Sequence, residues 1–326
     1  MKGTTIIMKQ RKVIIFFLVC VIVLFAGMAV FLFMRNSAVT YPTEFEEYVS
    51  EDTVVYKEKE YRYNEHLSNY LFMGIDTSSD EPTEIGRADA IFLISYDRLA
   101  KTATCISIPR DTMANVRMIA PDGTDTGTSR EHINMQYLFG DGKHTSCRLM
   151  KDTVSNLLYD IPILGYCSLK LDGITAAVDA LGGVEVVVPD DSMAQAYPEF
   201  TKGAVVTLTK DNLEPFVRYR DITKHQSALD RTNRQKVLLK TVFAQLKDGS
   251  TIDSDKITNL YDHLTPYMVT NIGNDVLLDL SEADFGSPAT ILDIPGTAVA
   301  GELHDEYHVD ELVLYEFVLE HFYEEQ

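Results

Sequence analysis

The sequence predicts an α/β fold, because short apolar runs alternate along it with longer segments whose apolar residues recur at helical spacing. Three runs, at residues 69–74, 90–96 and 103–108, are too short for typical helices and are bounded by turn-forming or charged residues. They are expected to be adjacent central strands. Helical patterns follow at residues 146–158 and 172–181. Strands that alternate with helices are typical of the α/β class.

The second half of the chain continues this alternation. Asp172 is expected to cap the helix over residues 172–181, and Gly182 and Gly183 are expected to end it. In chain order, the remaining expected elements are strands at 184–188 and 205–208, helices at 210–217 and 230–246, a strand at 289–294 and an amphipathic helix at 309–323.

The N-terminal region predicts a single membrane anchor. Residues 13–34 are uncharged and mostly apolar, and at about 1.5 Å of rise per residue they are long enough to cross a hydrocarbon core of about 30 Å. Basic residues precede this segment and acidic residues follow it, which places residues 1–12 in the cytoplasm and the rest outside. A cleaved signal peptide is the alternative, but the apolar run is longer than usual and no small-x-small cleavage site ends it.

Residues 35–63 are polar and acidic and are expected to form a juxtamembrane linker, with one extracytoplasmic domain over residues 64–326. The whole chain carries a net charge of −20. Residues 1–35 hold five basic residues and no acidic ones, which leaves 24 basic against 49 acidic residues, or −25, outside. This charge argues against nucleic-acid binding, so any anionic ligand must be held locally.

The cysteines predict neither a disulfide framework nor a zinc site. Three cysteines follow the predicted span, an odd number, and they show no paired or metal-ligand spacing. Cys105 and Cys167 lie in strand-like runs and are expected to be small core residues.

Arginines are concentrated in one part of this acidic chain. Four of the eleven arginines that follow residue 35 lie between Arg218 and Arg234, and none comes later. If Arg218 and Arg220 lie in an extended segment they face the same side and could bind one diphosphate together, whereas in a helix they would diverge. Arg231 and Arg234 share a face at a predicted helix start, with Gln235 close by; a solvated helix face capped by Asp230 is the alternative.

Two aspartates and an arginine are expected to meet where two neighbouring strands begin and end. Asp76 follows the first strand, and Arg87 and Asp89 open the second. In an antiparallel pair the carboxylates of Asp76 and Asp89 would lie together. They would bind a hard cation such as Mg²⁺, which favours carboxylates combined with phosphate oxygens, or they would pair with Arg87.

Arg110 follows the third strand, and Pro109 fixes the direction in which the chain leaves it. Strand ends are where α/β sheets usually place ligands. An ion pair with Asp111 is the alternative role for Arg110.

Together and in this order, these motifs resemble the LytR-CpsA-Psr family of membrane-anchored cell-wall ligases. The resemblance covers residues 69–246 and weakens toward the C-terminus. The motifs that carry it are Asn-Tyr-Leu-Phe-Met-Gly-Ile-Asp76, Gly-Arg87-Ala-Asp89, Ser-Ile-Pro-Arg110-Asp111, Ile-Asn134, Val-Asp-Ala-Leu-Gly-Gly-Val184, Val-Arg218-Tyr-Arg220 and Arg231-Thr-Asn-Arg234-Gln235.

The resemblance implies an α/β/α sandwich whose central mixed sheet and helices enclose an apolar pocket for a polyprenyl chain. It implies that Asp76 and Asp89 bind Mg²⁺ and act with Arg110 in catalysis. The positions it matches to diphosphate contacts are Arg87, Arg110, Arg218, Arg220, Arg231 and Gln235. The chain departs from the family in its approach to Arg231, where His-Gln-Ser-Ala-Leu-Asp replaces an Asp-Phe-Gly-like run.

The implied reaction transfers a phosphoglycan, of teichoic-acid or capsule type, from undecaprenyl diphosphate to a hydroxyl of peptidoglycan. The donor stores the energy, so no ATP is needed, and the chain has no Gly-rich Lys-Ser/Thr phosphate loop. Two other classes stay open: a pyrophosphatase that hydrolyses the lipid diphosphate, and a non-catalytic lipid-binding regulator of the cell envelope.

Overall fold

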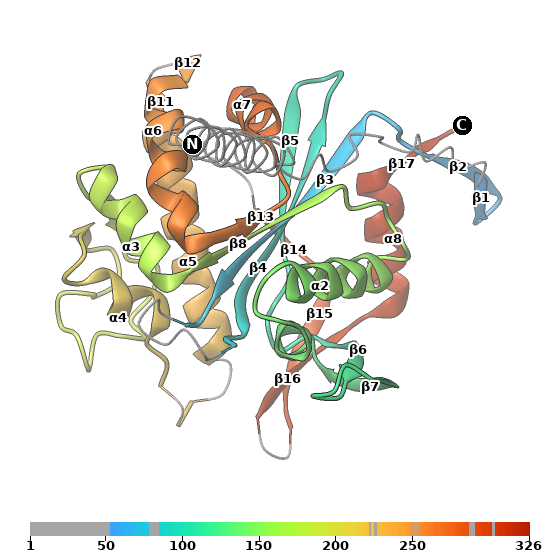
Figure 1. Cartoon of the computed structure of the whole chain (residues 1–326), viewed down its shortest axis with the longest axis horizontal. Helices are drawn as coiled ribbons and strands as arrows, with labels where there is room; N and C mark the ends of the chain where they lie inside the picture. Colours follow the sequence, from blue (N-terminus) through green and yellow to red (C-terminus); the bar gives the residue numbers. More distant parts are fainter. Residues whose placement is uncertain are drawn as a thin grey trace, which may run out of the picture. The chain divides into compact units, whose positions relative to one another are not determined.

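A six-stranded mixed sheet forms the centre of the fold (Figure 1). Its strand order is β13-β8-β3-β4-β5-β14. The long strands β3 (Leu67–Ile75) and β4 (Ala88–Asp97) are antiparallel, as are β4 and β5 (Thr102–Ser107). β8 (Gly165–Lys170) runs parallel to β3, β14 (Ile291–Asp293) runs parallel to β5, and β13 (Met268–Thr270) pairs antiparallel with β8. The three strands predicted from the early apolar runs are confirmed as neighbours.

The structure, a computed structural model, describes residues 53–77, 85–221, 223–224, 227–248, 251–252, 254–286, 291–301 and 304–326. The expected cytoplasmic segment 1–12 and membrane span 13–34 lie outside these residues. Within the described ranges, no helix combines the length and the apolar character that crossing a membrane requires.

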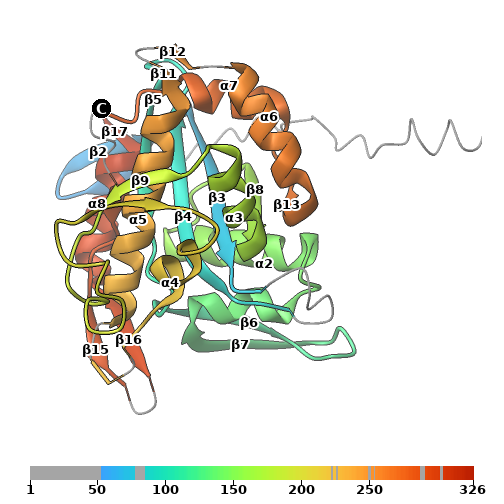
Figure 2. The same ribbon diagram turned by 90° about the vertical axis from the view of Figure 1, so that its left-hand side faces the viewer.

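Both faces of the sheet are covered by helices, because side chains along the central strands are apolar on both sides. Leu71 and Met73 of β3 belong to the core cluster that includes α2 (His144–Leu157) and α8 (Glu311–Phe322). Tyr70 and Phe72 belong to the cluster on the opposite face. Figures 1 and 2 show that face covered by α3 (Leu171–Ala180), α5 (Ser227–Leu246), α6 (Ser254–Leu264) and α7 (Asn274–Glu282). The expected three-layer arrangement is present.

A third core cluster joins the short helix α4 (Leu213–Arg218) to α5 and to the ribbon of β9 (Val184–Val187) and β10 (Val205–Leu208). Phe200 and Phe216 are fully buried there, with ring centroids 5.4 Å apart. This cluster fixes α4 beside α5, which matters for the arginines that both helices carry.

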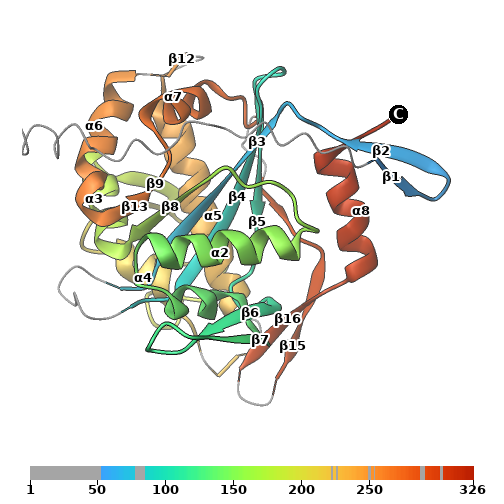
Figure 3. The ribbon, with the colours of Figure 1, turned by 45° about the vertical axis from the view of Figure 1, so that its right-hand side comes forward.

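Short elements surround these layers, several of which Figure 3 shows. They are β6 (Met113–Ile119), β7 (Asp125–His132), η1 (Ile133–Phe139), β11 (Lys247–Asp248), β12 (Thr251–Ile252), η2 (Thr265–Tyr267), β15 (Gly296–Ala300) and β16 (Asp305–Val309). A three-stranded sheet joins β1 (Thr53–Tyr56), β2 (Lys59–Tyr63) and β17 (Tyr323–Glu325).

Several boundaries differ from the sequence prediction. The last residues of the expected linker, 53–63, form β1 and β2, and β2 pairs with β17 near the C-terminus, so the folded part begins before residue 64. Lys170, not Asp172, occupies the N-cap position of α3, with no side-chain cap hydrogen bond, and Asp172 lies in the first turn. Helix α5 begins three residues before Asp230. Gly182 and Gly183 do follow the end of α3, both with positive φ.

Candidate functional site

The chain brings the predicted site residues to one edge of the sheet. Because β4 is antiparallel to both β3 and β5, the start of β4 lies beside the ends of its two neighbours. Asp76 follows β3, Asp89 opens β4, and Arg110 follows β5. The backbone approach is tight: a Cβ on Gly86 would lie 2.8 Å from Ile75 Cγ2. The expected proximity of the two strand ends is therefore confirmed.

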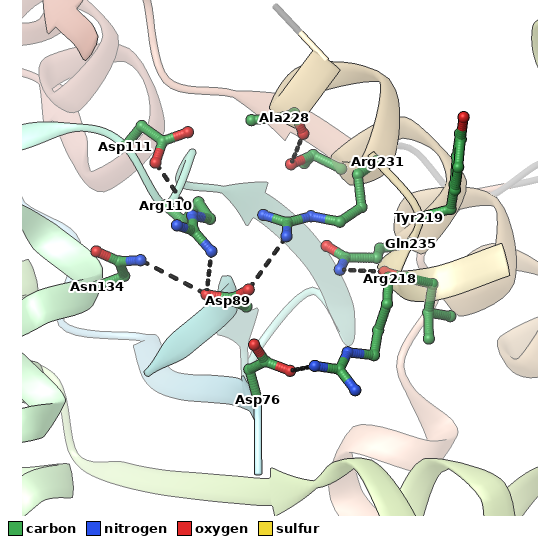
Figure 4. Close-up of polar contacts among 12 residues, drawn as sticks. Asp76, Asp89, Arg110, Asp111, Asn134, Arg218, Tyr219, Ala228, Arg231 and Gln235 are labelled. Carbon is green, nitrogen blue, oxygen red and sulfur yellow. Dashed lines mark hydrogen bonds and ion pairs between the residues drawn. The ribbon is translucent and has the colours of Figure 1, made fainter. Parts of the chain in front are cut away.

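Asp89 is the centre of the polar cluster (Figure 4). Its Oδ1 accepts a hydrogen bond from Arg110 Nη1, and its Oδ2 accepts one from Arg231 Nη1 at 3.1 Å. Asn134 Nδ2 lies 3.5 Å from Asp89 Oδ1. Only 12% of the Asp89 side chain is exposed, so these contacts are sheltered from water and are stronger than surface pairs.

Arg110 links Asp89 to a second carboxylate. Its Nε donates to Asp111 Oδ1 at 3.0 Å, which confirms the ion pair considered as the alternative. Burial lowers the pKa of Arg110, but the carboxylates of Asp89 and Asp111 outweigh that effect and raise it. Arg110 therefore stays charged, with its fork held by two acids.

Arg231 is a buried cation whose hydrogen-bonding capacity is only partly used. It is 6% exposed, and its Nε and Nη2 have no hydrogen-bond partner within the described residues. Burial lowers its pKa, Asp89 opposes that effect, and Arg110 and Arg220 add to it. Buried donors without partners cost free energy. An anion that accepted from these donors would remove that cost.

Arg218 connects the mouth of the site to Asp76. Its Nη2 lies 2.9 Å from Asp76 Oδ1, and its Nη1 donates to Glu214 Oε1 at 2.8 Å. Arg218 is the last residue of α4, so the segment that carries Arg218 and Arg220 is not extended throughout, as the sequence prediction had considered. In the described part of the chain, neither the Arg220 nor the Arg87 guanidinium has a hydrogen bond or ion pair. The expected alternative of a pair between Arg87 and the two aspartates is thus not seen there.

Arg234 and Arg231 do not act on one face, contrary to the expectation from their spacing. Arg231 reaches Asp89, whereas Arg234 donates to the backbone carbonyls of Phe216 and Tyr219. Gln235 Nε2 donates to Val217 O at 3.1 Å, and its Oε1 has no partner in the described structure.

An apolar cavity of about 410 Å³ opens onto this cluster. Its walls come from β3, β4 and β8 on the sheet side and from α3, α5, α6 and α7 on the helix side. Asp76, Asp89, Arg218, Arg231 and Gln235 also line it. Cys167 is part of the wall rather than of the closed core. The site thus joins an apolar compartment to a cluster of arginines and aspartates.

The two aspartates suit a hard cation in their chemistry. Asp76 and Asp89 line the same cavity, and carboxylate oxygens are ligands that Mg²⁺ prefers. Within the described residues, no group of three or more His, Cys, Asp and Glu side chains could hold a metal ion. Phosphate oxygens and water would therefore have to complete the coordination, as is usual for Mg²⁺.

Sequence reasoning missed the contacts of Asn134 and Arg234. Asn134 was part of the family resemblance without an assigned role, and it is 1% exposed beside Asp89. Neither residue has a local sequence signal, because their partners are far along the chain or belong to the backbone.

Comparisons with known proteins agree with the fold. The chain is 30% identical over 243 residues to "Polyisoprenyl-teichoic acid--peptidoglycan teichoic acid transferase TagU" of Halalkalibacterium halodurans, covering 73% of this chain and 72% of that protein. It is 28% identical over 234 residues to the enzyme of the same type named TagT from Bacillus subtilis, covering 69% and 64%.

Solved structures show the same architecture. The crystal structure of B. subtilis TagV matches with a TM-score of 0.58 and 25% identity, over 78% of this chain and 94% of that one. The structure of TagT bound to LI-WTA matches with a TM-score of 0.56 and 22% identity, over 78% and 88%, and supports the fold alone. The LytR_cpsA_psr family profile matches residues 30–312. The chain therefore belongs to the LytR_cpsA_psr family.

Proposed function

We propose that this protein is a phosphotransferase that moves a phosphoglycan from undecaprenyl diphosphate to a hydroxyl of peptidoglycan at the outer face of the membrane. One observation carries the proposal: an apolar cavity meets a cluster of buried arginines and aspartates at the edge of the sheet. A polyprenyl chain fits the apolar walls, and a diphosphate fits the arginines. The related proteins named as teichoic acid transferases support the choice of reaction.

The arginines would bind the diphosphate and stabilise charge as it develops. Arg231 offers two donors that have no partner in the described residues. Arg87 and Arg220, which form no hydrogen bond or ion pair there, would add theirs. Arg110 and Arg218 would exchange part of their carboxylate contacts for phosphate oxygens. Gln235 lines the same cavity and adds a polar side chain. Preorganised donors of this kind stabilise phosphoryl transfer chiefly by position and charge.

In the proposed reaction the acceptor hydroxyl oxygen forms a bond to the glycan-linked phosphorus. The bond from that phosphorus to the bridging oxygen breaks, and polyprenyl phosphate leaves with the electron pair. The hydroxyl proton passes to a carboxylate, for which Asp76 and Asp89 are the candidates lining the cavity. Arg110 would stabilise the leaving phosphate.

Asp76 and Asp89 would also hold Mg²⁺, which would neutralise negative charge on the diphosphate when bound. We further propose that residues 13–34 anchor the protein in the cell membrane, with residues 1–12 in the cytoplasm and the domain outside. Such an anchor would hold the site where lipid-linked glycans and peptidoglycan meet.

The test uses the full chain in detergent, a labelled polyprenyl-diphosphate glycan, Mg²⁺ and peptidoglycan. Arg110→Ala should lower transfer by about 100-fold or more, since removing one group that stabilises transition-state charge typically costs that much. A chelator should also abolish transfer. Arg98→Ala is the matched control, because Arg98 donates to the carbonyls of Glu65 and His66 at the other end of β4.

Other outcomes would change the assignment. Release of free phosphoglycan in the presence of peptidoglycan would indicate hydrolysis. Binding without any product would indicate a regulator. Normal transfer by folded Arg110→Ala would show that Arg110 has no role in the reaction.

A further inference from the structure

Arg234 is a fully buried cation beside the site, and the proposed reaction gives it no contact with the substrate. It is 1% exposed. Burial lowers its pKa, although the nearby carboxylates of Asp190 and Asp230 oppose this effect. Burying a guanidinium is costly unless its donors are satisfied. The groups that its donors contact therefore indicate what the residue does.

All three nitrogen atoms of the Arg234 guanidinium donate to neutral oxygen atoms. Nε donates to Phe216 O at 2.8 Å, Nη2 donates to Tyr219 O, and Nη1 donates to Ser192 Oγ at 2.6 Å. Ser192 lies between β9 and β10, whereas Phe216 and Tyr219 lie at the end of α4. One side chain of α5 thus connects that helix to two other segments, the end of α4 and the chain between β9 and β10.

The contacts at α4 satisfy carbonyl groups that a helix cannot satisfy itself. The last four carbonyls of any α-helix lack partners within the helix, and α4 has only six residues. Arg234 donates a hydrogen bond to the carbonyl of Phe216, and Gln235 donates one to the carbonyl of Val217. Short helices are marginal without such support. The end of α4 is therefore held from α5.

The end of α4 carries the arginines that matter for the site. Arg218 closes α4 and lines the cavity, and Arg220 follows two residues later. Arg231, less than one turn before Arg234, contacts Asp89 from the same helix. The stretch of α5 from Arg231 to Gln235 therefore places one anion-binding arginine itself and anchors the segment that supplies two more.

We propose that Arg234 is a positioning residue that holds the end of α4, and with it Arg218 and Arg220, at a set separation from Arg231. This inference rests on the proposed function, because it assumes that these three arginines bind one diphosphate. Small displacements of binding groups cost large factors in binding and rate. A merely structural role for Arg234 would lower stability without acting through Arg218 and Arg220.

The experiment is a double-mutant cycle on binding. The probe is a fluorescent polyprenyl diphosphate without glycan, titrated into the full chain in detergent, with the melting temperature of each variant measured in parallel. Arg234→Met should weaken binding about tenfold in the wild-type background. In a protein that already carries Arg218→Gln and Arg220→Gln, Arg234→Met should weaken binding less than about twofold. The two arginines that Arg234 is proposed to position are absent from that protein, so their loss of position can no longer affect binding.

Three further variants sharpen the test. Arg234→Lys keeps the charge but not the planar fork; it should bind as weakly as Arg234→Met, and wild-type binding by it would overturn the proposal. Arg98→Met removes comparable bonds to backbone carbonyls far from the site and should leave affinity unchanged. If Arg234→Met does not fold, Ser192→Ala replaces it, with about threefold weaker binding expected in the wild-type background only.

The outcomes separate this inference from the proposed function. Equal losses in both backgrounds, or no loss in either, would overturn the positioning role while leaving the function in place. Failure of the wild-type protein to bind the probe would instead contradict the proposed diphosphate site itself.

Discussion

At the scale of single residues, Asp89 organises the site. Both of its carboxylate oxygens accept from buried guanidinium groups, which come from segments 21 and 142 residues away in the chain. Asn134 adds a third donor at 3.5 Å. A single carboxylate thus orients two arginines and reduces the repulsion between them, while Nε and Nη2 of Arg231 stay without a partner in the described residues.

Asp89→Asn should therefore destabilise the protein, because two buried arginines would lose their shared countercharge. Removing one partner of a buried ion pair costs about 3 to 5 kcal/mol, and we expect a loss of about 3 kcal/mol in the free energy of unfolding. Urea unfolding at pH 7.5 measures it. The matched control is Asp125→Asn, which removes an exposed pair with Arg117 and should leave the unfolding midpoint unchanged. An unchanged midpoint for Asp89→Asn would show that the buried pairs contribute no net stability.

At the scale of elements, the helices on the α5 face leave space above the sheet instead of filling it. Leu260, Tyr261 and Leu264 of α6 line the cavity and are only partly buried. Ile174 and Ala177 of α3 line it too. A cavity lined this way is apolar and forfeits packing contacts, so it is expected to accept an apolar ligand.

Ala177→Phe tests what the cavity is for. A phenyl ring there should occupy space that a long polyprenyl chain needs, so transfer from a long-chain donor should fall about tenfold or more. Transfer from a donor with a short chain should change less than about twofold, because the diphosphate contacts stay intact. The transfer assay with both donors measures the difference. Ala180→Phe, on an exposed position of the same helix, is the control. Equal losses with both donors would show that the cavity does not hold the chain.

At the scale of the whole molecule, burial sets the response to alkaline pH. Burial raises the pKa of Cys147 to about 11 and the pKa values of Cys105 and Cys167 to about 12, from an ordinary value near 9. The three-layer fold keeps these thiols protonated where the unfolded chain would ionise them.

The raised pKa values of the thiols lower the stability of the folded protein at alkaline pH. Between about pH 9 and pH 11 the unfolded chain binds fewer protons at these thiols than the folded protein, so stability falls as pH rises. The stability that the protonated thiols contribute is complete below about pH 9 and is lost as pH rises through the folded-state pKa. Urea midpoints at pH 7.5, 9, 10 and 11 should decline across this window. Cys147→Ala should reduce the slope between pH 9 and 11; an unchanged slope would contradict a role for this thiol.

The elements that could be predicted from the sequence are the buried ones, in which apolar residues recur at regular intervals. The structure confirms the strands predicted at residues 69–74, 90–96 and 103–108, which are β3, β4 and β5. It also confirms the helix predicted at residues 146–158, which is α2. These segments are buried on one or both faces, so their apolar residues repeat with the period of the element. In contrast, β7 is almost entirely exposed, and β13 has three residues. Neither presents enough apolar residues for a period to be visible.

The class of fold, the family and the residue types of the site could be predicted from the amino-acid sequence, because they depend on local pattern and on motif order. Asp76 and Asp89 could be placed together in advance, since antiparallel neighbours bring their ends to one edge. Arg110 was expected at a strand end, and only the family resemblance added it to the same site. The pairing of these side chains could not be predicted and depends on the packing of distant segments. In the structure, Asp89 accepts hydrogen bonds from Arg110 and Arg231, whereas Arg234 donates to a backbone carbonyl of α4. Spacing along a helix fixes a direction relative to that helix alone, whereas the partner on that side depends on how distant segments pack.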